Sequence, residues 1–238
     1  MSSELNSVFR SPHQLYVFLT LESAAYTGEV KLGDWDNFFN LTMTYRHDSD
    51  VFLPYGRVVR AKDEQKRRIG GKKKKQLAAW LVSNCKTHSG REHLVRELEK
   101  YLPPDSIHIY GRCGNRSCEG GSLGDRDNCW DMIQDNYKFY LSLENSICLD
   151  YVTEKMFDAL KHDVVPVVLG GTDYHKVFPE NSFINMLDFS NMSQLADHLG
   201  NDITLSPDDF SKYCFQWIFG RMKINTPNIS SGSQNMRF

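Results

Sequence analysis

Short apolar runs alternate with amphipathic stretches along most of this chain, and this order predicts an α/β fold. Runs rich in branched and aromatic side chains predict buried strands. The stretches between them have the period of helices with one apolar face. The predicted strands are 15–21, 76–85, 107–110, 137–143, 164–169 and 183–187, and the predicted helices are 91–101, 192–199 and 209–219.

The stretch 137–171 has the pattern of a complete βαβ unit, and the rest of the chain is arranged around it. Its first strand is aromatic and aliphatic, and its second is rich in valine and ends at a Gly-Gly pair. Between them, Val152, Met156, Ala159 and Leu160 form one apolar helix stripe. Asp150 stands just before the stripe, where we expect the N-cap.

Lys155 lies in the early turns of this helix, where the helix dipole favours anions over cations. A lysine there is explained if an anion binds at the helix N-terminus and the ammonium group helps to hold it. On spacing alone, the simpler alternative is a solvated lysine paired with Asp158 or Glu154.

The residues of this unit resemble the donor-binding signature of the α1,3/α1,4-fucosyltransferases, glycosyltransferase family 10. The similarity lies in the strand YKFYL, the turn ENS and the helix start DYVTEK. It implies a GT-B fold, with two Rossmann-like domains facing across a cleft and the N-terminal one incomplete. It also implies GDP-fucose as donor. The donor-binding residues that it implies are Glu144, Asn145, Tyr151, Glu154 and Lys155.

The resemblance covers about residues 15–219 and divides the chain into three parts. We expect a partial acceptor-side domain in 1–70, a donor-binding Rossmann-like domain in 71–219, and a polar tail in 220–238 that does not resemble the family's C-terminus. The stretch 57–75 is strongly basic and contains four consecutive lysines. Because it lacks interleaved aromatic residues, we expect a solvated connection rather than a nuclear signal or an RNA-binding patch.

Glu22 follows the predicted strand 15–21, and α/β folds place their chemistry just past the C-terminal ends of strands. The resembling family has the motif L/M-E-S-P here, and its glutamate is the proposed general base. LESAAYTG matches that motif, although Ala24 replaces the proline. The resemblance therefore implies that Glu22 is catalytic. Without it, a surface glutamate at a strand end is the simpler interpretation.

The block 38–56 also resembles the family, and it contains an Asp-Ser-Asp triplet at 48–50. D-x-D binds a metal in other glycosyltransferases, but the motif is short and common, and the GT-B family needs no such site. We therefore expect no metal. Tyr45 and Arg46 are candidates for walls of the cleft, and structural packing explains both equally well.

Ser83 and Asn84 lie in a polar turn after the strand 76–85, where backbone N–H groups can face a phosphate. Arg91 follows at the start of a helix. The family has an arginine at the corresponding place, which grips the donor pyrophosphate, and a guanidinium group suits bidentate contacts of this kind. The resemblance implies donor-binding roles for all three.

Composition excludes some classes of protein. A net charge of −2 and a pI near 6.4 give no case for a partner nucleic acid. No run approaches the roughly 18 apolar residues of a membrane helix, and the first ten residues do not form a signal peptide. The resembling proteins are type II Golgi proteins. We therefore expect a Golgi-lumenal location, with membrane attachment only through an anchor absent from this sequence.

The cysteines and sequons agree with a secretory route. An even count of six cysteines suits an oxidising compartment. Cys113, Cys118, Cys129 and Cys148 have no familiar zinc spacing. Zinc stays possible, but we expect at least one disulfide involving the first three of these, which crowd into the loop-rich segment 103–131. The candidate glycosylation sites are Asn40, Asn115, Asn191 and Asn228.

The function implied by the resemblance is inverting transfer of L-fucose from GDP-fucose to the 3-hydroxyl of GlcNAc. Glu22 would take the acceptor proton, while Arg91 and Lys155 would stabilise the leaving phosphate, without a metal or other cofactor. The partner acceptor is an N-glycan core or a lactosamine-type glycan; the CGNRSC element resembles invertebrate members, including those that fucosylate the N-glycan core. Two alternatives stay open: a truncated, inactive relic that binds only nucleotide or glycan, and a transferase with another donor.

Overall fold

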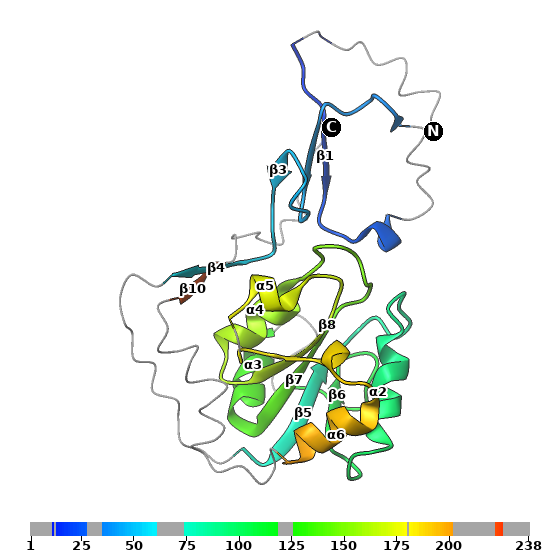
Figure 1. Ribbon diagram of the computed structural model, residues 1–238, viewed down its shortest axis with the longest axis vertical. Helices are drawn as coiled ribbons and strands as arrows, with labels where there is room; N and C mark the ends of the chain where they lie inside the picture. Colours follow the sequence, from blue (N-terminus) through cyan, green and yellow to red (C-terminus); the bar gives the residue numbers. More distant parts are fainter. Residues whose placement is uncertain are drawn as a thin grey trace.

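The structure is a computed structural model, and it describes residues 11, 13–27, 35–60, 74–118, 126–179, 181–201 and 222–225. Two parallel sheets confirm the α/β class (Figure 1). The smaller sheet has the order β1-β2-β3 and the larger one the order β6-β5-β7-β8-β9. A third, two-stranded sheet pairs β10 with β4. None of the helices in the described ranges is long and apolar enough to cross a membrane.

The larger sheet forms the centre of the C-terminal part. Its strands are β5 (Gln76–Leu81), β6 (Ile107–Tyr110), β7 (Tyr137–Leu143), β8 (Val165–Leu169) and β9 (Ile184–Asn185). All of their pairings are parallel, and Phe139 is opposite Val165 in the register of β7 and β8. β7 and β8 therefore confirm the predicted strands of the central βαβ unit.

Helices cover both faces of this sheet, which explains why its strands are apolar without alternation. The helices α2 (Arg91–Glu99) and α6 (Met192–Asn201) pack against one face together with Phe139, Leu141 and Leu143. The helices α3 (Arg126–Asn136) and α4 (Glu154–Lys161) lie on the opposite side, where Tyr140 contributes to a second cluster (Figure 1).

The N-terminal part consists of β1 (Val17–Thr20), the 3-10 turn η1 (Ala24–Tyr26), β2 (Leu41–Thr44) and β3 (Val51–Phe52). We predicted that the first strand is buried, and that prediction was wrong. β1 is an edge strand, and Val17 and Leu19 are 42% and 55% exposed. Its other side is more protected, because Phe18 packs edge-on against Phe39.

Several predicted boundaries differ from the structure. β5 ends at Leu81 rather than at residue 85, and the strand predicted at 183–187 is the two-residue β9 followed by the 3-10 turn η3 (Met186–Asp188). The Asn185 side chain accepts a hydrogen bond from the Leu187 N–H, which turns the chain out of the sheet. The short helix α5 (Tyr174–Val177) follows β8. The helix predicted at 209–219 lies outside the described residues.

Our predictions lacked several elements, including one helix and one C-terminal strand. The first is α3, which begins inside the segment 103–131 that we expected to be loop-rich and extends beyond it to Asn136. The second is β10 (Met222–Asn225), which lies in the predicted polar tail and pairs antiparallel with β4 (Arg57–Arg60) in the predicted connection. Residues 57–60 of the connection and 222–225 of the tail therefore form one small antiparallel sheet. The domain division itself remains a prediction.

Candidate functional site

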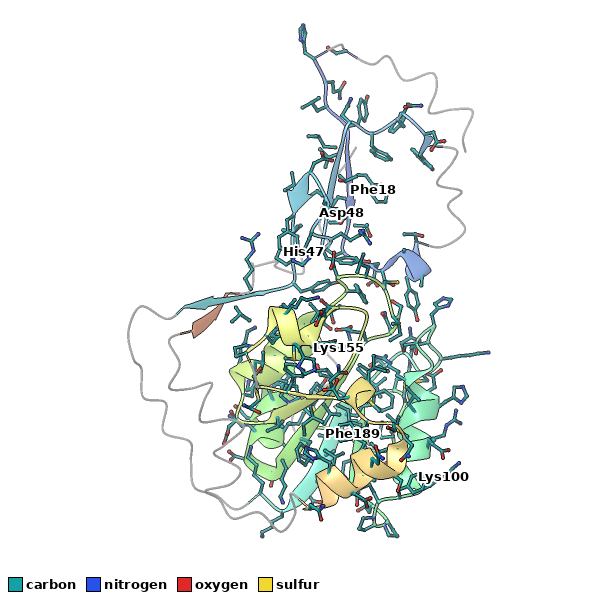
Figure 2. The ribbon with its side chains drawn as sticks, viewed as in Figure 1. Phe18, His47, Asp48, Lys100, Lys155 and Phe189 are labelled. Atoms are coloured by element: carbon teal, nitrogen blue, oxygen red, sulfur yellow. A yellow bond between two sulfur atoms is a disulfide. The ribbon has the colours of Figure 1, made fainter. Side chains whose placement is uncertain are left out.

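Two loops from distant parts of the sequence meet beside the C-terminal end of β7. One is the turn after β1, and the other is the segment that joins β7 to α4. Ser146 Oγ donates a hydrogen bond to Ser23 Oγ, and both side chains are buried. Nearby, the His47 N–H donates to Asp150 Oδ2 at 3.2 Å, and Figure 2 shows His47 at the end of the N-terminal part that faces Lys155. These contacts bring the two predicted halves of the site together.

Glu22 lies in the first of these loops and is exposed. The Tyr151 hydroxyl donates a hydrogen bond to Glu22 Oε2 at 3.4 Å. Tyr151 itself is 1% exposed, and its ring packs edge-on against Tyr45 with the ring centres 4.9 Å apart. Burial, reinforced by the nearby Tyr55 and Glu22, raises the pKa of Tyr151, so its hydroxyl stays a proton donor. The candidate base and the donor motif are thus in direct contact.

Glu144, Thr153 and Lys155 form a buried polar cluster at the start of α4. Glu144 is completely buried, and its carboxylate accepts hydrogen bonds from the Thr153 N–H at 2.8 Å and from the Thr153 hydroxyl. Lys155 Nζ lies 3.1 Å from Glu144 Oε2 and 3.4 Å from Glu154 Oε1. Glu144 therefore has no surface left for a direct contact with a donor, and any influence on the donor passes through Thr153 and Lys155.

The charges of this cluster depend on one another. Burial favours the neutral forms, which raises the pKa of Glu144 and works against the charge of Lys155. The Glu144 and Glu154 carboxylates outweigh burial at the lysine, so its pKa is raised above the ordinary value and the ammonium group persists at neutral pH. The simpler alternative for Lys155 was a solvated lysine paired with Asp158 or Glu154. The lysine is not solvated, because its side chain is only 19% exposed, and Asp158 pairs with Lys161 rather than with Lys155. The pair with Glu154 is confirmed.

The N-cap of α4 differs from the prediction. The cap residue is Thr153 and the helix begins at Glu154, three residues later than a cap at Asp150 would require. Asp150 has a left-handed backbone with φ of 62°, and its carboxylate faces His47. Asp150 thus joins this segment to the loop between β2 and β3 instead of capping the helix, and the predicted N-cap at Asp150 is wrong.

Arg91 is placed at the start of α2 but points into the protein. It is 3% exposed, and its guanidinium group donates to the carbonyl oxygens of Leu143 and Asn84 and lies over the Trp80 ring at 5.5 Å. Burial lowers its pKa, and Glu144 opposes that shift. In this conformation Arg91 ties together the ends of β5 and β7, so its expected grip on a pyrophosphate remains a proposal.

The remaining candidates lie around the same edge of the sheet. Asn84 is exposed, and its side-chain amide donates to the Tyr26 hydroxyl at 3.2 Å. The Ser83 carbonyl accepts from Arg112 Nε at 2.9 Å. Asn145 is half-buried, and its carbonyl accepts from the Ser89 N–H at 3.0 Å. Asn84 and Asn145 thus lie in the loops that border Glu22, whereas Ser83 is turned towards the end of β6.

Sequence reasoning missed several residues that shape this site. Ser23 and Ser146 belong to the motifs LES and ENS, and Thr153 belongs to DYVTEK, so their positions were visible but their buried contacts were not. Tyr55 was also missed, although its hydroxyl donates to the Leu21 carbonyl at 2.6 Å. Nothing in the spacing around Tyr55 indicates a partner 34 residues earlier in the chain.

The aspartates of the rejected D-x-D motif have separate tasks. Asp48 accepts hydrogen bonds from the Arg46 guanidinium group, while Asp50 accepts from the Thr42 N–H at 2.8 Å and from its hydroxyl. The Tyr45 ring packs against Tyr151, whereas the Arg46 guanidinium group forms an ion pair with Asp48. In the ranges that the structure describes, no group of three or more His, Cys, Asp or Glu side chains could hold a metal ion.

Two disulfides confirm the prediction about the cysteines. Cys118 pairs with Cys129, and Cys113 pairs with Cys85, which we had not included in the crowded segment. Cys148 is a free thiol. Of the sequon asparagines, Asn40, Asn115 and Asn191 are exposed, whereas Asn228 lies outside the described residues; their glycosylation remains a prediction.

Comparisons with known proteins agree on one family. The model of "Glycosyltransferase family 10 (fucosyltransferase) C-term" matches residues 71–234, and that of "Fucosyltransferase, N-terminal" matches residues 1–56. Alpha-(1,3)-fucosyltransferase C of Drosophila melanogaster is 39% identical over 228 residues, covering 87% of this chain and 51% of that protein. Alpha-(1,3)-fucosyltransferase fut-1 of Caenorhabditis elegans is 34% identical over 221 residues, covering 89% and 48%.

Glycoprotein 3-alpha-L-fucosyltransferase A of Drosophila melanogaster is 37% identical over 221 residues, covering 90% of this chain and 42% of that protein. The chain thus spans about half the length of these curated relatives. Among solved structures, an alpha1,3-fucosyltransferase with GDP-fucose superposes with a TM-score of 0.48 at 23% identity, covering 65% of this chain and 41% of that one.

Proposed function

Because the chain belongs to glycosyltransferase family 10, the fucosyltransferases, we propose that it transfers L-fucose from GDP-fucose to the 3-hydroxyl of GlcNAc in a glycoprotein glycan. We take the fold to be a GT-B arrangement in which the N-terminal part faces the acceptor and the C-terminal part binds the donor. The observation that carries this proposal is the contact between the Tyr151 hydroxyl and Glu22 Oε2. It places an accessible carboxylate against the donor motif.

The proposed reaction inverts the configuration at the anomeric carbon of fucose. Glu22 takes the proton of the acceptor 3-hydroxyl, and the acceptor oxygen forms a bond to the anomeric carbon. The bond between that carbon and the GDP oxygen breaks on the opposite face, and its electron pair goes to the β-phosphate. General-base catalysis of this kind contributes roughly 10²–10⁴-fold.

The leaving phosphate needs positive charge on the donor side. Lys155 supplies it in this proposal, because its ammonium group persists at neutral pH and stands at the start of α4, where N–H groups also face anions. Arg91 adds a fixed positive charge behind the loop. We assign donor contacts to Asn84, Asn145 and Glu154. For Ser83, which is turned towards β6, and Tyr151, which is 1% exposed, donor contacts rest on the resemblance to the family alone. The scheme uses no metal or other cofactor.

The location that we propose is the Golgi lumen, with membrane attachment through an anchor as in the family. Two disulfides support an oxidising compartment, because such bonds persist there and are rare in the cytosol. Three exposed sequon asparagines agree with it.

The test is transfer from GDP-fucose to a panel that contains lactosamine and core-chitobiose glycans, read by mass spectrometry. Glu22→Gln should retain GDP binding and lose transfer by about 10²-fold or more, with the loss in kcat, because the amide keeps the shape but cannot accept the proton. Glu97→Gln, a half-buried glutamate on α2 that pairs with Lys100, is the matched control and should transfer normally.

Each other outcome points to a specific alternative. A wild-type chain that binds GDP but transfers no fucose is the inactive relic that binds only nucleotide or glycan. Transfer from another sugar nucleotide in competition with GDP-fucose identifies a different donor. Full activity in Glu22→Gln removes Glu22 from the base role and leaves the family assignment intact.

A further inference from the structure

Tyr55 fixes the backbone directly before Glu22. It lies after β3, it is half-buried, and its hydroxyl donates to the Leu21 carbonyl at 2.6 Å. Leu21 is the last residue before the candidate base, beyond the end of β1. A short hydrogen bond from a tyrosine held in the fold limits how far this carbonyl can rotate. It therefore also limits the movement of the Glu22 backbone, from which the carboxylate side chain extends.

The same tyrosine also contacts the residue that reaches Glu22 from the donor side. The rings of Tyr55 and Tyr151 meet edge-on with centres 6.3 Å apart. Burial raises the pKa of Tyr55, and the nearby Glu154 and Glu22 reinforce the rise, so its hydroxyl remains protonated at neutral pH and can keep donating to Leu21. Tyr55 thus holds the backbone of the base loop, which is the turn after β1 that carries Glu22, while Tyr151 holds the Glu22 carboxylate.

The base loop has need of such support. Glu22 is exposed, and Ala24 follows it at a place where a proline would have restricted φ. The loop's other described attachments are the buried Ser23, which receives the Ser146 hydroxyl, and Tyr26, which receives the Asn84 amide. Both of those lie on the C-terminal side of Glu22. On the N-terminal side, the Glu22 N–H donates to Thr20 Oγ1 at 3.2 Å, and Tyr55 adds a contact from outside the loop.

We propose that Tyr55 is a positioning residue for the base: it acts through the Leu21 carbonyl to hold Glu22 in the geometry for proton removal. This inference rests on the proposed function, in which Glu22 is the base. Tyr55 touches neither donor nor acceptor in this assignment. Its effect therefore belongs to the step in which the proton moves, and donor binding should not depend on it.

The kinetic test is Tyr55→Phe, which keeps the ring and removes only the donor to Leu21. We expect kcat to fall by about 10- to 100-fold, since small displacements of a catalytic group have effects of that order, while KM for GDP-fucose and GDP affinity stay unchanged. Tyr110→Phe is the matched control, because its hydroxyl is also hydrogen-bonded, to Tyr137, but lies on β6. It should transfer like the wild type.

A double variant separates positioning from a general structural role. If Tyr55 acts through Glu22, adding Tyr55→Phe to Glu22→Gln causes no further loss of kcat, whereas a structural defect lowers it again by the same factor. A further loss in the double variant, an unchanged kcat in the single variant, or a loss confined to KM overturns the proposal.

Amide hydrogen exchange tests the positioning without relying on transfer. Tyr55→Phe should speed exchange at 22–26 while 137–143 in β7 stays protected, and Tyr110→Phe should leave 22–26 unchanged. If the wild type transfers no fucose, the proposed function fails, yet faster exchange at 22–26 still shows that Tyr55 holds this loop. Unchanged exchange at 22–26 overturns the inference even in an active enzyme.

Discussion

Replacing Lys155 with methionine tests whether Lys155 and Glu144 stabilise the fold as a buried ion pair. Lys155 Nζ lies 3.1 Å from Glu144 Oε2 and donates to Thr153 Oγ1 at 2.7 Å. Methionine keeps most of the volume and removes the charge. Glu144, which is completely buried, then keeps only the two Thr153 donors and loses its counter-charge.

The expected magnitude follows from the burial of the partner that remains. Removing one member of a buried pair costs about 3–5 kcal/mol, because an uncompensated charge is left away from water. In a protein of this size, 1 kcal/mol shifts Tm by roughly 2–4 °C. We therefore expect Lys155→Met to lower Tm by about 6–20 °C at neutral pH.

The deficit should depend on pH in one direction. Burial raises the pKa of Glu144 in the folded state, and removing Lys155 takes away the main group that opposes the rise. A carboxyl whose folded pKa exceeds its unfolded pKa binds a proton more tightly when folded, so acid favours folding. The variant should lose stability as pH rises from the ordinary value of 4.5 through the raised pKa, so the deficit is largest at neutral pH.

The assay is thermal unfolding, followed by circular dichroism, from mildly acidic to neutral pH. Lys161→Met is the matched control: it lies on the same helix and pairs with Asp158 at 3.0 Å, but that pair is nearer the surface. Surface pairs contribute about 0–1 kcal/mol, so a small change is expected. Equal deficits in the two variants, or a Lys155→Met deficit that does not change with pH, would contradict the buried-pair argument.

Two further predictions concern ligand binding and the disulfides. Lys155→Ala should weaken GDP binding in calorimetry while Lys161→Ala does not, and equal affinities would remove Lys155 from the site. Replacing the Cys85–Cys113 pair by serines should destabilise the fold by about 3.5 kcal/mol in urea unfolding, and replacing Cys118–Cys129 by about 3 kcal/mol, because the first bond closes the longer loop, 28 rather than 11 residues apart. The reverse order would contradict the loop-entropy explanation.

The centre of the fold was predictable because its sequence carries strong local signals. β7 and β8 are short and continuously apolar, and the stripe of α4 includes the buried Met156 and Ala159. α3 was missed because few apolar residues, chiefly Trp130 and Ile133, interrupt its Asp- and Asn-rich sequence. β10 was missed because its partner β4 is far away in the sequence, and strand pairing over such distances leaves no local pattern.

The residues that make up the site were predictable, but the directions in which their side chains point were not. A motif can indicate that Arg91 and Glu144 belong to the site, yet only packing decides that both point inward. The Asp150 cap failed for a similar reason. An aspartate before a helix stripe is a good local cap, but the Asp150 carboxylate is taken by His47, which is 103 residues away. Contacts between distant loops decide such cases.

Glu22 and Glu144 show how environment can suit identical side chains to different chemical roles. A general base must reach the acceptor hydroxyl and hold no proton before the reaction. Glu22 is exposed and receives one hydroxyl donor at 3.4 Å, so a hydroxyl group of a substrate can approach its carboxylate. Glu144 is sealed from solvent, and Thr153 and Lys155 occupy its oxygens. Burial also raises its pKa. Glu144 can therefore hold Lys155 in place but cannot reach an acceptor, and this contrast supports our proposal that Glu22 removes the proton.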